Sequence, residues 1–180
     1  MQLLALDVIN GVPAHPLVVH IPVVMIPLAL ALTVLAFWKR VRTSALWCAT
    51  GSAAIGLVGA ALAGGTGEAL QNAVERTKLL REHTQAGEAV APVAAVLLAA
   101  LVVALIAHLS AGDSVPFFGS LPIAKKMGAG ALTAVLVLSS VIGVAATWVT
   151  YDAGHTGAKS AWRNVDLTKV HENEGHGDDD

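Results

Sequence analysis

Residues 89–109 read AVAPVAAVLLAALVVALIAHL and contain no Asp, Glu, Lys or Arg. A helix of about 20 apolar residues spans the ~30 Å hydrocarbon core of a bilayer. Three further apolar runs of similar length cover roughly residues 16–38, 45–63 and 127–151. The sequence therefore predicts an all-α protein, a four-helix transmembrane bundle.

Composition supports this class and limits the domain count. The 180 residues are 55% hydrophobic and 13% charged, which is about half the charge of a typical soluble domain. We predict one four-span membrane domain over residues 1–160 and a polar, partly disordered tail over 161–180. No basic stripe interleaved with aromatic residues indicates nucleic-acid binding. The expected partners are the lipid bilayer and either other membrane redox subunits or further copies of this chain.

Glycine and proline predict where the spans bend and end. Pro22 and Pro27 lie inside the first run, so we expect a kink or a widened turn there. Gly64-Gly65-Thr66-Gly67 is expected to break or cap the second helix. Gly154 and Gly157 are expected to cap the fourth helix at its C-terminal end.

The distribution of Lys and Arg predicts the orientation. Residues 1–38 contain neither residue type, whereas Lys39, Arg40 and Arg42 follow the first span. The charge rule for membrane helices places such a loop in the cytoplasm. We therefore expect a multi-pass protein of the bacterial cell (inner) membrane with both termini extracytoplasmic. Counted over all helix ends, Lys and Arg are nearly balanced between the two sides, so this orientation rests on the flanks of the first span.

Four of the seven histidines are predicted to converge at one end of the bundle. They would still converge if the protein had the opposite orientation in the membrane. They are the two near the start of the first span, one near the start of the third and one just past the fourth: His15, His20, His83 and His155. His108 belongs to the opposite end. At ~1.5 Å per residue it lies about 37 Å from His83 along a continuous helix.

Histidines inside a helix bundle suit several chemistries. Two facing imidazoles hold haem b as axial ligands, and imidazole also binds copper, zinc or iron, often with carboxylate. A metal-free proton or quinone site, or ordinary helix capping, would use the same residues. Cys48 is the only cysteine, so covalent haem attachment through C-x-x-C-H is excluded. The carboxylates expected at the same end are Glu68, Glu82, Glu88 and Asp152.

Helical spacing separates the roles of these residues. Thr147, Tyr151 and His155 fall on one helix face, so we expect Tyr151 to orient a ligand or contact a cofactor, or else to make an ordinary interhelical hydrogen bond. His15 and His20 point about 140° apart on an ideal helix, which favours different roles for the two. His20 lies deeper in the span and is expected to be the firmer ligand.

Several short motifs resemble a known family. Residues 11–20 read GVPAHPLVVH, and TGE at 66–68, EH at 82–83, GE at 87–88 and GHTGA at 154–158 follow in order. This series resembles an uncharacterised bacterial family of predicted four-helix membrane proteins, a domain of unknown function. The resemblance covers roughly residues 10–160. It implies that His15, His20, His83 and His155 are signature positions.

These patterns together predict a membrane-embedded, b-type haem-binding protein. It would be a cytochrome-like electron-transfer protein or a subunit of a redox complex, rather than a free-standing enzyme. Its ligands would come from the four converging histidines, with Tyr151 beside the cofactor. The alternatives are a non-haem transition-metal-binding membrane protein, with copper, zinc or iron, and a cofactor-free structural subunit of a membrane complex.

Overall fold

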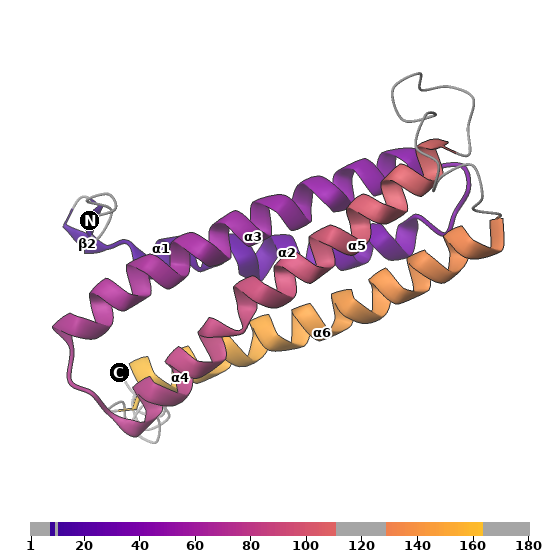
Figure 1. The fold of residues 1–180 in the computed structure, drawn as a ribbon. Helices are drawn as coiled ribbons and strands as arrows, with labels where there is room; N and C mark the ends of the chain where they lie inside the picture. Colours follow the sequence, from indigo (N-terminus) through magenta and orange to yellow (C-terminus); the bar gives the residue numbers. More distant parts are fainter. Residues whose placement is uncertain (1–7, 10, 111–128, 164–180) are drawn as a thin grey trace, which may run out of the picture.

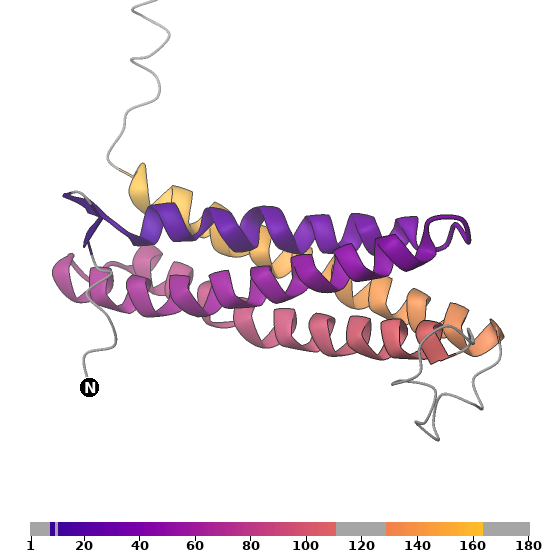
Figure 2. The same ribbon diagram turned by 90° about the horizontal axis from the view of Figure 1, so that it is seen from above.

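The long helical segments lie side by side in an antiparallel bundle (Figures 1 and 2). The computed structural model describes residues 8, 9, 11–110 and 129–163. Among these residues, four segments are long and apolar enough to cross a membrane: His15–Leu35, Arg42–Gln71, Lys78–Ser110 and Gly130–Ala161. The predicted all-α, four-helix transmembrane bundle is therefore confirmed. The predicted tail from residue 164 onward falls outside the described residues.

A two-residue hairpin precedes the bundle. Strand β1 (Val8–Ile9) pairs antiparallel with β2 (Val12–Pro13). Gly11 in the turn has a φ of 83°, a left-handed conformation that glycine adopts without the steric cost of a Cβ atom. The hairpin leads directly into the first span.

The first helical hairpin consists of α1 (His15–Val18), α2 (His20–Leu35) and α3 (Arg42–Ala73). The first span changes from α1 to α2 at Val19. Pro22 explains this position, because its nitrogen carries no hydrogen for the Val18 carbonyl and its ring crowds that oxygen. The predicted distortion is thus found one turn before Pro22, whereas Pro27 lies within α2.

The second helical hairpin consists of α4 (Lys78–Glu88), α5 (Val90–Ser110) and α6 (Ala129–Ala161). Its first span is interrupted in the same manner, at Ala89. Pro92 lies three residues later and cannot donate to the Glu88 carbonyl. Helix α4 is polar, and its first turn is capped by Thr77, whose hydroxyl accepts a hydrogen bond from the Leu80 nitrogen at 3.2 Å.

Two of the predicted helix ends are wrong. Helix α3 continues without a break through residues 64–67 to Ala73, and α6 continues through Gly154 and Gly157 to Ala161. A glycine inside a helix costs about 1 kcal/mol relative to alanine, which tertiary packing readily exceeds. Here α3 packs against α1 and α6 packs against α4. Gly67 and Gly157 lie at these contacts, against the His15 and His83 rings, whereas Gly64, Gly65 and Gly154 have nothing close to a would-be Cβ.

The core is narrow and consists mainly of small and aliphatic side chains. Helix α3 approaches α2 closely at Gly56, where a Cβ atom would lie 2.9 Å from the Ile26 side chain. The buried Thr33 hydroxyl donates to the Ala29 carbonyl at 2.6 Å, within its own helix. Many large apolar side chains remain exposed on the outer surface, as expected where lipid is the surroundings. The largest fully buried aliphatic side chains are Ile26, Leu46, Leu97, Leu101 and Leu136.

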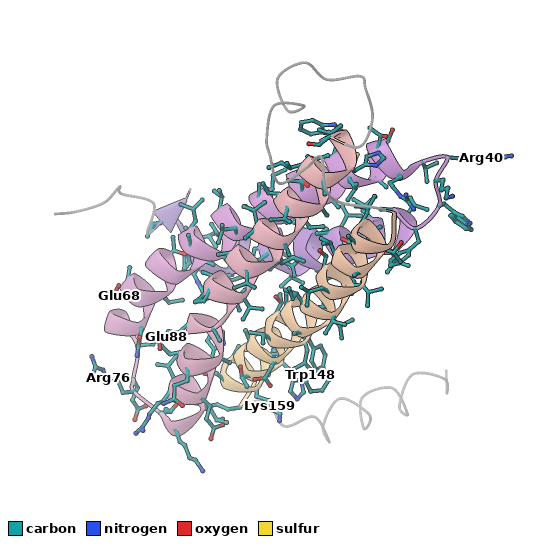
Figure 3. The ribbon with its side chains drawn as sticks, turned by 45° about the vertical axis from the view of Figure 1, so that its right-hand side comes forward. Arg40, Glu68, Arg76, Glu88, Trp148 and Lys159 are labelled. Atoms are coloured by element: carbon teal, nitrogen blue, oxygen red, sulfur yellow. The ribbon has the colours of Figure 1, made fainter. Side chains whose placement is uncertain are left out.

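The antiparallel arrangement brings four helix ends together. The start of α1, the end of α3, the start of α4 and the end of α6 all lie at one end of the bundle (Figure 1). We call this the histidine end. Figure 3 labels Glu68, Arg76, Glu88 and Lys159 at this end and Arg40 at the opposite end. Charged side chains therefore mark both ends of the apolar spans.

Candidate histidine site

Two of the predicted histidines meet at the histidine end. His15 begins α1 and His83 lies within α4, so they come from different helical hairpins. Their ring centroids are 6.0 Å apart, and the ring planes are inclined at 69° in an edge-to-face arrangement. Both side chains are half-buried. We call these two residues the histidine pair.

The His15 ring is oriented by helix α3. Its Nδ1 lies 2.9 Å from the carbonyl oxygen of Ala63. A carbonyl oxygen only accepts, so Nδ1 carries the hydrogen and donates it. The ring also lies against Gly67, where a Cβ atom would be 2.9 Å from its Cε1. Helix α3 thus fixes both the tautomer and the position of the ring.

The His83 ring is oriented by helix α6 through the same kind of contact. Its Nδ1 donates to the carbonyl oxygen of Ala153 at 3.0 Å. A Cβ atom at Gly157 would lie 2.9 Å from its Cε1. Both carbonyl-bearing alanines are buried, so the acceptors are shielded from competing water.

The hydrogen bonds at Nδ1 determine what the other nitrogen can do. In a neutral imidazole with its hydrogen on Nδ1, Nε2 carries an available lone pair. Histidines that bind metals typically donate their second ring N–H to a carbonyl or carboxylate in this way. The histidine pair therefore presents two oriented Nε2 atoms suited to accept a metal centre.

The spacing of the pair suits one shared ligand. Bonds from a metal ion to imidazole nitrogen are about 2.0–2.1 Å long, which places two rings on one ion with centroids about 5 to 6.5 Å apart. The observed 6.0 Å lies within this interval. The pair has the separation of two imidazoles bound to one metal.

His20 and His155 lie at the same end but outside the pair. His20 is exposed, and its Nδ1 donates to the carbonyl oxygen of Pro16 at 2.7 Å within the same span. His155 is exposed on α6 and stacks on Tyr151, with ring centroids 5.7 Å apart and planes 10° apart. Tyr151 also contacts Trp148 at 5.9 Å. The predicted helical register of Tyr151 and His155 is observed, and it places both rings on the outer surface.

The predicted carboxylates do not join the histidine pair as a cluster. Glu68, Glu88 and Asp152 are exposed, and Glu82 lies 3.8 Å from Lys78. Within the part of the chain that the structure describes, no three His, Cys, Asp or Glu residues are grouped as a metal site. The possible metal ligands that the structure brings together here are thus the two imidazoles of the histidine pair.

His108 lies at the opposite end of the bundle, as predicted. Its Nε2 is 2.8 Å from the hydroxyl oxygen of Thr43, near the start of α3. His108 is half-buried. His108 is thus hydrogen-bonded to Thr43 through Nε2, the nitrogen that carries no hydrogen in the histidine pair.

The residues that orient the pair were missed by the sequence predictions. Ala63 and Ala153 act through their backbone, and Gly67 and Gly157 through the absence of a side chain, so none carries recognisable chemistry. A signal was nevertheless present, because residues 63–67 and 153–157 share the pattern A-G-x-T-G. The glycines of this pattern were interpreted as helix ends instead.

The fold and the site define a four-span membrane protein with an oriented pair of histidines at one end. The sequence profile of a family of predicted membrane proteins, DUF2231, matches residues 11–169. The chain belongs to this family, and the resemblance inferred from its motifs is confirmed at the family level. No curated protein and no solved structure is significantly similar to the chain.

Proposed function

We propose that this membrane protein binds a b-type haem between His15 and His83 and passes electrons as a cytochrome-like protein or as a subunit of a redox complex. One observation carries the proposal: two neighbouring imidazoles from different helical hairpins, in edge-to-face contact, each donate Nδ1–H to the carbonyl of a buried alanine. Histidine is a common axial ligand of haem iron. Helix bundles hold such cofactors between side chains on facing helices.

The number of donors favours haem over a bare metal ion. A structural zinc site takes four ligands, and a catalytic zinc site takes three from protein. The described residues bring two imidazoles together. Haem needs only axial ligands from the protein, because the macrocycle occupies the four in-plane positions. The donor set therefore fits the axial ligands of haem better than it fits non-haem copper, zinc or iron.

The contacts favour His15 over His20 as the ligand from the first span. His15 is directed at the neighbouring hairpin and fixed by α3, whereas His20 is exposed and bonded within its own span. The Ala63 and Ala153 carbonyls hold the two rings in place and keep the hydrogen on Nδ1. Bound haem would supply one-electron chemistry near one face of the membrane. Other membrane redox subunits, or a second copy of the chain, would exchange electrons at that face.

Titration of the purified full-length protein with haemin tests this proposal. We expect a Soret band that saturates at one haem per chain, and sharp α and β bands after reduction. Absence of a Soret band in protein expressed and titrated with excess haem would overturn the proposal. Elemental analysis of the same sample would then show whether copper, zinc or iron takes the site instead.

For the orientation, we propose a bacterial inner-membrane protein with the histidine end extracytoplasmic. Lys39 and Arg40 lie between α2 and α3, and Arg42 is the first residue of α3. These three cationic residues support the orientation, since no Lys or Arg precedes the first span. Val41 and Lys159 are exposed at opposite ends. In a Cys48→Ala background, an impermeant maleimide should label Lys159→Cys but not Val41→Cys in spheroplasts, from which the outer membrane barrier has been removed. Labelling of Val41→Cys alone would reverse the orientation.

A further inference from the structure

A five-residue pattern occurs twice in the chain and in equivalent places. Residues 63–67 read AGGTG, and residues 153–157 read AGHTG. The first copy lies toward the C-terminal end of α3 and the second toward the C-terminal end of α6. Each copy thus belongs to the second long helix of a helical hairpin. Each faces a histidine from the first span of the same hairpin.

The contacts made by the two copies correspond one by one. The first residue of each copy, Ala63 or Ala153, accepts the Nδ1 hydrogen of the histidine at 2.9 or 3.0 Å. The fifth residue, Gly67 or Gly157, lies against Cε1 of that histidine, 2.9 Å from a would-be Cβ in both cases.

The threonine in each copy also contributes equivalently. The Thr66 hydroxyl can donate to the carbonyl of Leu62, at 3.0 Å, or to that of Ala63, at 3.2 Å. The Thr156 hydroxyl can likewise donate to the carbonyl of Asp152, at 2.8 Å, or to that of Ala153, at 3.1 Å. The first carbonyl of each copy is therefore contacted by a hydroxyl and an imidazole together. Two separate parts of the chain build the same cradle for a histidine ring.

We propose that the site consists of two equivalent half-sites, in which Gly67 and Gly157 are positioning residues for His15 and His83. Each half-site would hold one imidazole with its Nε2 available to the metal of the proposed cofactor. This inference rests on the proposed function for the identity of the ligand. The cradles themselves rest only on the contacts within the chain.

The need for glycine follows from the close approach of ring and helix. A contact of 2.9 Å is shorter than packed carbon atoms adopt, so an alanine at Gly67 or Gly157 would force the ring to move. In each half-site the glycine and the alanine carbonyl lie on the same helix face and contact the same ring. A ring displaced from the glycine position would therefore also move away from the carbonyl of Ala63 or Ala153. The fixed tautomer and the direction of Nε2 would then be lost.

The repeat also separates His155 from the half-sites. His155 is the third residue of its copy, and the equivalent residue of the other copy is Gly65. Both positions are exposed, so the repeated contacts do not involve them. His155 is thus the feature in which the two copies differ.

Matched glycine variants test the half-sites. Gly67→Ala and Gly157→Ala are compared with Gly64→Ala and Gly154→Ala, which lie in the same two copies but have nothing within 4 Å of a would-be Cβ. All four gain the same helix propensity, so a difference reports the histidine contact. The first readout is nitrogen-15 NMR of histidine-labelled, haem-free protein in detergent, assigned with His15→Gln and His83→Gln.

In the parent protein and in both control variants, we expect protonated Nδ1 and unprotonated Nε2 signals for His15 and His83. Gly67→Ala should shift only the His15 signals and Gly157→Ala only the His83 signals. With haem, each of these two variants should bind about 10- to 100-fold more weakly, the usual effect of losing an outer-shell partner. The matched controls should bind like the parent.

Two results would overturn the half-sites. One is that Gly67→Ala and Gly157→Ala give the same histidine signals as their controls. The other is that either substitution shifts both histidines to the same extent. The NMR readout needs no haem, so a protein with intact cradles and no Soret band would refute the proposed function while leaving the positioning roles supported.

Discussion

The two ends of the bundle both hold histidine, but they use it differently. At the histidine end, His15 and His83 donate through Nδ1 to backbone carbonyls and lie 6.0 Å apart. At the opposite end, His108 is bonded through Nε2 to the Thr43 hydroxyl. The first arrangement leaves Nε2 of each of two neighbouring rings without a hydrogen, because the hydrogen is on Nδ1. The second engages the corresponding nitrogen of a single ring.

This difference shows that a histidine at a membrane end is not by itself a site. Buried or half-buried imidazoles need hydrogen-bond partners, and a nearby hydroxyl is enough for His108. The histidine pair becomes a candidate site because two rings share one location and the same nitrogen of each is engaged. The neighbouring helix sets which ring nitrogen carries the hydrogen and which remains available to a ligand.

The largest expected effect comes from removing a member of the histidine pair. His83→Ala should weaken haem binding by more than the about 10- to 100-fold typical of an outer-shell loss, because a direct ligand is removed. His108→Leu, at the other end, should leave the haem affinity unchanged. Spectrophotometric haem titration measures both. Equal losses in the two variants would contradict the distinction between the ends.

A smaller effect is expected for the other histidines of the histidine end. His20→Ala and His155→Ala remove exposed rings outside the pair. Each variant should therefore bind haem less than about 10-fold more weakly than the parent protein, which is less than the loss typical of an outer-shell partner. The same titration checks this, with Tyr151→Phe to test the stacked neighbour. Loss of the Soret band in His20→Ala would instead restore the ligand role predicted from its depth in the span.

The smallest effect is expected at the Thr43–His108 contact. Thr43→Val removes one hydrogen bond, worth about 0.5–1.5 kcal/mol of the free energy of unfolding. For a chain of this size, 1 kcal/mol corresponds to a Tm decrease of about 2–4 °C. Thermal unfolding in detergent measures it, and the haem spectrum should not change. If Thr43→Val and His108→Leu lower the Tm additively, the two side chains are not coupled.

The fold was predictable because lipid imposes a strong constraint on composition. An apolar run such as residues 89–109 has few alternatives to a membrane-spanning helix, and all four spans are found. The helix ends were less predictable. The glycines of residues 64–67 and 154–157 were interpreted from local preference as helix ends. Helices α3 and α6 continue past them, and of these glycines only Gly67 and Gly157 pack against another element, at the His15 and His83 rings.

The convergence of histidines was predictable, but their pairing was not. Helix order places His15, His20, His83 and His155 at one end, as found. The pairing of the rings depends on how each helix is rotated and on which backbone carbonyls are nearby. Neither can be inferred from the identity of the residues. Ala63 and Ala153 contribute only an oxygen that every residue possesses.

The spin state of the ferric haem protein tests the central claim most directly. Two imidazole ligands from His15 and His83 predict a low-spin electron paramagnetic resonance spectrum for the parent protein. His15→Ala and His83→Ala should each give a high-spin spectrum that returns to low spin when imidazole is added. A high-spin parent protein, or a low-spin spectrum that persists in both variants without added imidazole, would contradict ligation by this pair.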